Sequence, residues 1–170
     1  KGLFERICPK GKVGVFNIDN KEIKNLADFY ALNNHVLTIG YNETADLVIL
    51  NQKFYPKNQD IRFSFRDKIY QKSINLIGAF KAENLLMAAL LVISSGQQES
   101  NIFGILEDIK PVRGRMELAA TRKNGATVYV DYAHTPDAIE VALKSLKPHI
   151  LGKLIVIIGA GGERDEGKRP

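Results

Sequence analysis

The sequence predicts an α/β fold built in two parts, and three observations carry this prediction. Stretches with the spacing of an apolar helix face alternate with short apolar runs of strand length. Residues 61–65 alternate as Ile-Arg-Phe-Ser-Phe, the period of a strand with one buried face. Residues 153–158 form a continuous apolar run, Lys-Leu-Ile-Val-Ile-Ile, typical of a strand buried on both faces of a parallel sheet.

The first part, residues 1–111, is predicted to contain five strands, two of which form an antiparallel pair, and three helices. Apolar side chains on nearly every side of residues 85–93 indicate that the longest helix is buried. Pro111 and Gly114 mark a joint, so we place a domain boundary near Val112 and a hinge at the same point. The expected elements are strands 12–16, 36–39 and 46–50, an antiparallel pair 61–65 and 69–76 joined at Arg66-Asp67, and helices 21–33, 78–95 and 100–109.

The second part, residues 112–170, is predicted to open with a hairpin. Asn124-Gly125 separates strands 116–121 and 126–130 and is the strongest hairpin signal in the chain. Thr135 as N-cap and Pro136 at the first helical position begin a helix that extends to Leu146. The strand at 153–158 follows. Because an α/β domain continues with further elements, and the chain starts at Lys1, we expect a part of a longer protein.

Composition excludes several classes of protein. The 170 residues carry a net charge of +5, with 45% hydrophobic and 25% charged residues, as a folded globular domain does. The longest apolar run has nine residues, against the ~18 that a membrane span needs, and no secretion leader opens the chain. The lone Cys8 excludes a disulfide framework and favours a reducing cytoplasm. The modest positive charge fits an anionic small molecule, and no basic helix or aromatic ribbon indicates nucleic acid.

The glycine-rich stretch from Gly159 to Pro170 is the first candidate for chemistry. A glycine turn after a buried strand presents backbone N–H groups to an anion. A P-loop is disfavoured because Arg169 stands where a Ser or Thr would bind Mg²⁺, and a dinucleotide fingerprint is disfavoured because Arg164 replaces the third glycine. A plain turn remains, or a charged loop whose arginines and Lys168 bind a carboxylate.

Three further places have both a functional and a structural interpretation. Asp131 ends a strand and His134 precedes a helix, so Asp131 can accept hydrogen bonds from ribose hydroxyls, or both residues only shape the turn. Arg115 at the joint can reach a phosphate, or it belongs to a solvated basic linker. Asn84, on the first turns of the buried helix, can recognise a base edge, or it is an ordinary exposed side chain.

Five motifs in a fixed order resemble one family. The sequence resembles the Mur ligases of peptidoglycan synthesis over essentially all 170 residues, and the last two motifs are similar to the type that adds the third residue of the peptide. The other motifs are also shared with folylpolyglutamate synthetases. The motifs are NID at 17–19, GAF…EN at 78–84, GRME at 114–117, DYAHTP at 131–136 and GAGGERDEGKRP at 159–170.

The resemblance implies an architecture and a reaction. Residues 1–111 would be the second half of a P-loop-type central ATP-binding domain with a small antiparallel sheet, and residues 112–170 the first half of a Rossmann-like C-terminal domain. ATP and Mg²⁺ would be the cofactors of amide-bond formation through an acyl phosphate. The substrates would be UDP-N-acetylmuramoyl-L-alanyl-D-glutamate and a diamino acid, meso-diaminopimelate or lysine. The P-loop would lie upstream of Lys1, so the isolated chain should be inactive.

The resemblance also assigns roles to nucleotide-binding residues. Asn84 matches the family asparagine near the adenine, and Arg115 the arginine that reaches the nucleotide from the joint. Asp131 matches the aspartate on the ribose, with His134 in the same loop. The family usually has an asparagine where Lys81 stands, so Lys81 either reaches a phosphate or points to solvent.

Two residues at the ends of the chain complete the assignment. Arg164 matches the arginine that holds the carboxylate of the incoming amino acid. Lys1, followed by Leu3-Phe4, resembles the lysine that the family carbamylates to bind a second Mg²⁺. Carbamylation turns a cation into an oxygen ligand for a hard metal, which is the ligand that Mg²⁺ prefers.

Other functions stay open at this point. A relative that is non-catalytic, or that acts on another acid, would differ in the sequence upstream and downstream of the chain. A Rossmann-type dinucleotide-binding module would need a glycine in place of Arg164 and an acidic residue about 20 positions further on. An interaction domain without a ligand is the third alternative. The oligomeric state is not indicated by any pattern.

Overall fold

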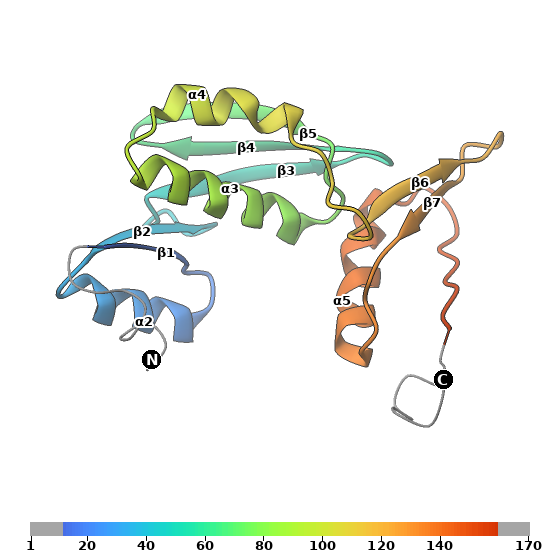
Figure 1. The fold of residues 1–170 in the computed structure, drawn as a ribbon, viewed down its shortest axis with the longest axis horizontal. Coiled ribbons are helices and arrows are strands. Elements are labelled where there is room, and N and C mark those ends of the chain that lie inside the picture. Colours follow the sequence, from blue (N-terminus) through green and yellow to red (C-terminus); the bar gives the residue numbers. More distant parts are fainter. Residues whose placement is uncertain (1–11, 160–170) are drawn as a thin grey trace.

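The computed structural model describes residues 12–159, which form a five-stranded mixed sheet with its helices and a smaller part made of a hairpin and a helix (Figure 1). Lys1 and Arg164 therefore lie outside the described residues. Within residues 12–159, no helix combines the length and the apolar character needed to cross a membrane. The fold class is α/β, as the sequence predicts.

The large sheet follows the order of the sequence, β1-β2-β3-β4-β5. Its first three strands are parallel, and β3, β4 and β5 are antiparallel. The connection from β1 to β2 is α2 (Lys21–Ala31), whose N-cap Asn20 accepts hydrogen bonds from the N–H groups of Glu22 and Ile23. The strands are β1 (Val13–Asn17), β2 (His35–Gly40), β3 (Leu47–Phe54), β4 (Gln59–Phe65) and β5 (Lys68–Ile74).

Alternating side chains give the sheet two buried faces at its parallel end. Phe16 points toward α2 and packs in a small cluster with Ala27 and Tyr30. Val15, its neighbour in β1, packs on the opposite face against the main core. That core lies under α3 (Ala79–Ser94) and α4 (Glu99–Gly104), which cover one face of the sheet (Figure 1).

The antiparallel strands confirm the alternation seen in residues 61–65. Ile61, Phe63 and Phe65 are buried with at most 1% exposure, while Arg62 points outward. The predicted turn at Arg66-Asp67 is also confirmed. Both residues have positive φ, 49° and 62°, as a tight two-residue hairpin requires.

Two helices differ from their predictions. Helix α3 is not buried on every side, because Leu91 and Val92 lie on its outer surface with 50% and 43% exposure. The helix predicted at 100–109 ends at Gly104 and continues as a 3₁₀ turn, η1 (Ile105–Asp108). The exposed residues of α3 arise because only the side of the helix that faces the sheet is covered (Figure 1).

The smaller part begins with the predicted hairpin, β6 (Glu117–Thr121) and β7 (Thr127–Val130). Gly125 has a φ of 84°, which the turn requires. Helix α5 (Pro136–Leu146) has Thr135 as N-cap, whose side-chain oxygen accepts the N–H of Ala138 at 3.3 Å, and a 3₁₀ turn, η2 (Lys147–His149), follows. This part lies beside the N-terminal end of α3 (Figure 1).

The strand predicted at 153–158 is not formed, and this prediction was wrong. The segment has no strand partner among the described residues, and Ile155 and Ile157 are 81% and 96% exposed. A parallel strand forms only where a neighbouring strand offers its N–H and C=O groups. Within residues 12–159, β6 and β7 pair with each other alone, so the apolar run finds no such neighbour.

Candidate functional site

Lys81 connects the start of α3 with the joint, where other residues expected to bind a nucleotide lie. Lys81 lies on the first turn of α3, and its ammonium donates a hydrogen bond to the backbone carbonyl of Arg115 in the joint. Asn84 follows Lys81 by three residues, so both lie on one side of the helix, and Asn84 is exposed. The structure therefore brings the helix position expected at the adenine next to the joint.

The Asp131 carboxylate also holds the backbone of the joint. Its Oδ2 atom accepts the N–H of Met116 at 2.9 Å, and its Oδ1 atom accepts the N–H of Ala133 at 2.8 Å. Each carboxylate oxygen has capacity for a second hydrogen bond, so Asp131 remains able to accept from a ligand hydroxyl. Its position directly after β7 is the one that the sequence predicts.

The backbone of the joint has an unusual conformation. Met116 is buried, with 2% exposure, and has a φ of 52°. A left-handed conformation at a residue other than glycine costs roughly 1–3 kcal/mol and persists where neighbouring groups hold it. Here Lys81 and Asp131 both hold it, because the carbonyl of Arg115 and the N–H of Met116 belong to the same peptide group.

Arg115 and His134 are joined through one aromatic ring. The Arg115 guanidinium lies 5.1 Å from the centre of the Tyr132 ring, a cation–π contact. The His134 ring meets the same tyrosine edge-on at 5.2 Å, and its Nδ1 atom lies 3.1 Å from the Tyr132 carbonyl oxygen. That carbonyl can only accept, so Nδ1 carries the proton and Nε2 is the ring nitrogen left for another partner.

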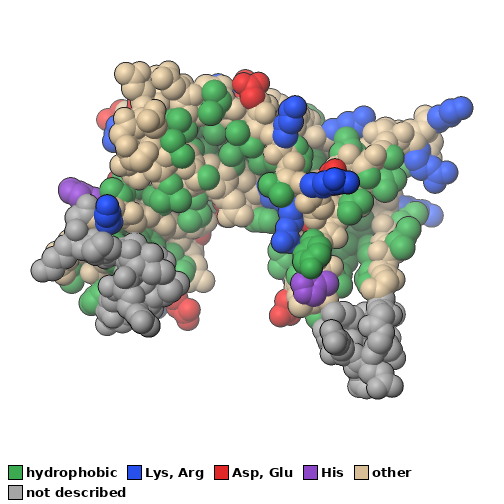
Figure 2. Space-filling model, in the orientation of Figure 1, with side chains coloured by type: hydrophobic (Ala, Val, Ile, Leu, Met, Phe, Trp, Pro, Cys, Tyr) green, Lys and Arg blue, Asp and Glu red, His purple; other side chains and the backbone are tan. Residues whose placement is uncertain are grey.

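The site is positively charged. Figure 2 shows Lys and Arg side chains over the junction between the two parts of the molecule and toward the tip of the β6–β7 hairpin, where Arg122 and Lys123 lie. Lys81 is half-buried, and its burial lowers the pKa of its ammonium; nearby Asp131 opposes this effect and Arg115 adds to it. Lys81, Arg115 and protonated His134 can each donate a hydrogen bond to a phosphate, so these groups favour an anionic ligand.

His149 supports the start of α3, and the sequence analysis did not identify this residue. It is buried, with 4% exposure, and its Nδ1 atom donates to the carbonyl of Tyr55 at 2.6 Å. Its Nε2 atom accepts the N–H of Gly78, the N-cap of α3, at 3.0 Å. The bond accepted by Nε2 requires the neutral ring, which burial favours by lowering the pKa of His149, while the bond donated to Tyr55 opposes this effect. No local motif marks this residue, because its partners lie 71 and 94 positions away.

The NID motif ties the parallel strands to the same helix. Asn17 donates to Glu83 at 3.1 Å, and Asp19 accepts the N–H of Tyr41 at 2.8 Å. Burial raises the pKa of Tyr41 to about 12, and burial together with Asp19 raises the pKa of Glu83. Glu83 directly precedes Asn84, so this cluster orients the exposed turn of α3 from the ends of β1 and β2.

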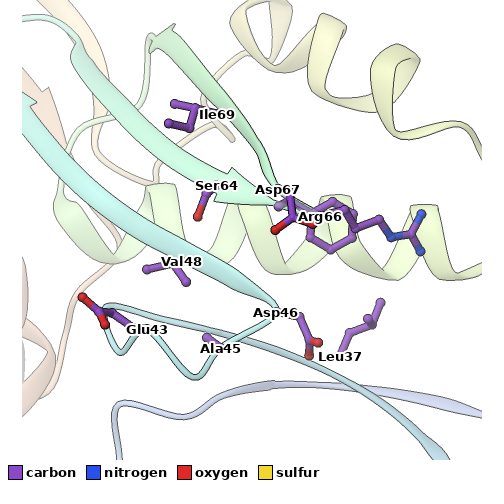
Figure 3. A pocket seen from close by; sticks show the side chains of 10 residues that line it. Leu37, Glu43, Ala45, Asp46, Val48, Ser64, Arg66, Asp67 and Ile69 are labelled. Carbon is purple, nitrogen blue, oxygen red and sulfur yellow. The ribbon is translucent and has the colours of Figure 1, made fainter.

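A separate pocket lies away from these residues. It has a volume of about 420 Å³ and opens between the β2–β3 connection and the β4–β5 turn (Figure 3). Its acidic side chains Glu43, Asp46 and Asp67 lie beside apolar ones such as Val48 and Ile69. The side chain of Asp46 is already bound by Thr38, through its backbone N–H and hydroxyl group, each at 2.7 Å. None of the predicted site residues that lie within 12–159 lines this pocket.

Metal binding is not supported by the described part of the chain. Within residues 12–159, no three His, Cys, Asp or Glu side chains lie close enough together to hold an ion. Lys1, the candidate Mg²⁺ ligand, and Arg164, the candidate carboxylate ligand, lie outside that range. Of the six predicted site residues, Arg115, Asp131 and His134 lie in the joint and the loop after β7, and Asn84 lies on α3 three residues after Lys81, which contacts that joint.

Comparison with known families decides the affiliation of the chain. The model of the Mur ligase middle domain matches residues 1–92, more than half of the sequence. The chain belongs to the Mur ligase family. The model of the Mur ligase glutamate ligase domain matches residues 114–170 of this Mur ligase chain, so the boundary expected near Val112 lies between the two matches.

Curated relatives of this Mur ligase chain share one name, UDP-N-acetylmuramoyl-L-alanyl-D-glutamate–2,6-diaminopimelate ligase. The identity is 36% over 169 residues with the protein of Caulobacter vibrioides, 40% over 172 with that of Rickettsia typhi and 43% over 174 with that of Bradyrhizobium diazoefficiens. Each alignment covers 99% of this chain but 34% or 35% of the relative. The chain thus spans about a third of the length of these relatives.

Solved structures agree with the family. A structure of a UDP-N-acetylmuramoyl-L-alanyl-D-glutamate–2,6-diaminopimelate ligase superposes with a TM-score of 0.71 and 28% identity, covering 93% of this chain and 33% of that one. A MurF ligase from Thermotoga maritima in complex with ADP has a TM-score of 0.66 at 17% identity, covering 82% and 31%, which shows a shared fold.

Proposed function

We propose that the protein containing this chain is an ATP-dependent ligase that adds meso-diaminopimelate to UDP-N-acetylmuramoyl-L-alanyl-D-glutamate. The observation that carries this proposal is the contact between the two Mur ligase domains, where Lys81, three residues before Asn84 on α3, and Asp131 both bind the Arg115–Met116 peptide. The choice of substrates rests on the shared name of relatives that align over nearly the whole chain.

In this proposal the site binds the nucleotide across the joint. Asn84 contacts the adenine from α3, the Asp131 carboxylate accepts the ribose hydroxyls, and Arg115 reaches the phosphates with His134 beside it. The exposure of Asn84 and Asp131 and the positive charge of the junction support these roles. Residues 1–111 and 112–170 then act as the two sides of one nucleotide site, with the domain boundary near Val112.

The reaction would proceed in two steps. A carboxylate oxygen of the UDP-linked dipeptide attacks the γ-phosphorus of ATP, and ADP leaves. The amine of the incoming amino acid then attacks the acyl carbon, and phosphate leaves as the amide forms. Phosphoryl transfer of this kind depends on positioning and on cationic groups rather than on a protein nucleophile, which suits the contribution of Arg115.

Two assignments of the proposal concern residues outside 12–159, Lys1 and Arg164. Mg²⁺, when bound, would neutralise charge on the phosphates, and carbamylated Lys1 is its proposed ligand. Arg164 is the proposed ligand of the amino acid's carboxylate.

The protein is expected to act in the cytoplasm, which suits the lone cysteine of this chain. We expect no nucleic acid or membrane partner.

The test uses the complete protein encoded by the reading frame that contains these residues, with Mg²⁺ present. ADP release is followed with UDP-N-acetylmuramoyl-L-alanyl-D-glutamate and either meso-diaminopimelate or lysine. We expect release that depends on meso-diaminopimelate, and a KM for that amino acid raised at least tenfold by Arg164→Ala, since a bidentate charged contact is lost.

Other results would redirect the assignment. Release with lysine alone would keep the ligase and change its acceptor. A folded protein that binds ATP but releases ADP with neither amino acid would overturn the proposal in favour of a ligase for another acid or a non-catalytic relative. The isolated 170 residues serve as a control and should show no turnover.

A further inference from the structure

Lys81 joins the two Mur ligase domains through one peptide group. Its ammonium, on the first turn of α3, donates to the carbonyl oxygen of Arg115. The N–H of that same peptide, on Met116, donates to Asp131 at 2.9 Å. The peptide is therefore held at its oxygen by one domain and at its nitrogen by the other.

The held peptide has a conformation that the chain does not adopt readily by itself. Met116 has a φ of 52° and is buried, and Gly114 before it has a φ of 66°. A glycine adopts positive φ readily, but a left-handed residue other than glycine, such as Met116, has nearby alternatives of lower backbone energy. The Gly114 N–H also donates to Glu117 at 2.7 Å, and the Arg115 N–H to the carbonyl of Val112 at 3.0 Å. We therefore expect the two hydrogen bonds to the Arg115–Met116 peptide to set the orientation of that peptide within the loop.

The orientation of this peptide decides where Arg115 points. The guanidinium of Arg115 lies over the Tyr132 ring at 5.1 Å, and the His134 ring contacts the same tyrosine. Lys81 also lies three residues before Asn84 on α3. One side chain thus connects the helix expected at the adenine with the residues expected at the ribose and phosphates.

We propose that Lys81 is a positioning residue of the nucleotide site, which orients the Arg115–Met116 peptide and so sets Arg115 and Asp131 relative to Asn84. This inference rests on the proposed nucleotide-binding function. It assigns a role to the position where the family usually has an asparagine. Two other roles are open to Lys81: it could bind a phosphate directly, or it could only point to solvent. Each role predicts a different effect of Lys81 variants on ADP affinity.

The experiment measures ADP binding to the complete protein by calorimetry. Lys81→Met keeps the aliphatic stem and removes the donor and the charge. We expect it to weaken ADP binding about tenfold, the usual effect of losing a hydrogen bond made by a charged group. Lys144→Met, which removes an exposed helix lysine paired with Glu140, is the matched control and should leave ADP affinity unchanged.

A double variant separates positioning from direct phosphate binding. If Lys81 acts through Arg115, the double variant Lys81→Met/Arg115→Ala should lose far less affinity than the product of the two single losses. A loss equal to that product would overturn the positioning role in favour of a direct contact between Lys81 and a phosphate. Unchanged affinity in Lys81→Met would overturn it in favour of a solvated side chain.

The kinetic parameters of turnover provide a second measurement, which distinguishes a positioning role from a loss of folding. We expect Lys81→Met to raise the KM for ATP with a smaller effect on kcat, whereas a smaller folded fraction would lower kcat and leave KM unchanged. A wild-type protein that does not bind ADP would refute the proposed function itself. ADP binding that is weakened by Arg115→Ala but not by Lys81→Met would refute this inference alone.

Discussion

A single buried imidazole connects the smaller part of the chain to the start of α3. His149 donates from Nδ1 to Tyr55 and accepts at Nε2 from Gly78. The protonated ring has no acceptor, so its Nε2–H would face the N–H of Gly78, donor against donor. The pairing therefore requires the neutral ring, which burial already favours by lowering the pKa of His149.

We predict that stability falls in acid because of His149. Its pKa in the folded chain lies below the ordinary value of 6.5, so the unfolded chain binds the proton first as the pH is lowered. The contribution is complete above pH 6.5, declines below it, and levels off once the pH passes the folded pKa. Urea unfolding between pH 5 and pH 8 would measure the change in the free energy of unfolding.

His149→Gln is the variant that tests this cause. Its side chain can make one of the two hydrogen bonds but does not titrate. We expect a loss of about 1–3 kcal/mol at pH 7, the cost of a buried group left without a partner, and a flatter dependence of stability on pH. A variant that keeps the wild-type pH dependence would show that other groups cause it.

Helix α3 is the element on which the site depends, and its N-cap is the most constrained position. Gly78 has a φ of 103°, its N–H is bound by His149, and its carbonyl accepts from Gln59 at 2.9 Å. A Cβ at this position would lie 3.1 Å from the Cβ of Ser145 in α5. The backbone of α3 therefore approaches α5 as closely as a glycine allows.

Two glycines with nearly equal φ allow this close approach to be tested. Gly96, after the end of α3, has a φ of 101°, and a Cβ added there would meet no atom within 4 Å. We expect Gly96→Ala to cost about 1 kcal/mol, from backbone strain alone. Gly78→Ala should cost about 1–3 kcal/mol more, because Ser145 must also move. Equal losses in thermal or urea unfolding would mean that the two helices separate without cost.

On the scale of the whole molecule, several polar contacts join the two parts. Tyr129 donates to the carbonyl of Pro56 at 2.5 Å, and His149 and Lys81 add the hydrogen bonds described above. Interfaces of this polar kind favour relative motion of domains. The hinge expected at Val112–Gly114 stays a prediction, and unchanged small-angle scattering of the complete protein on adding nucleotide and substrate would contradict it.

Among the described residues, the unpaired segment 153–158 is the most apolar exposed stretch. An exposed apolar run with free backbone groups is a site of self-association. We predict that the isolated chain associates through it, and that Ile155→Lys/Ile157→Lys lowers the weight-average mass in sedimentation. Leu32→Lys, at a similarly exposed position after α2, is the control and should change nothing. Association that persists in the double variant would place the contact elsewhere.

The sequence by itself determined the elements whose signals are local. The alternation of residues 61–65, the turn at Arg66-Asp67 and the N-cap at Thr135 each appear as predicted. These features depend on the pleat of a strand, on backbone conformation and on one side-chain hydrogen bond, all set within a few residues. The Mur ligase family followed from motifs of the same local kind, and the assigned residue roles stay predictions.

Only the tertiary structure decided how distant residues combine. The contact of Lys81 with Arg115 spans 34 positions, and that of His149 with Gly78 spans 71. No periodicity encodes such pairs, because they arise from the packing of one domain against another. The run at 153–158 shows the converse: its composition suits a buried strand, but a strand forms only beside a partner, and residues 12–159 provide none.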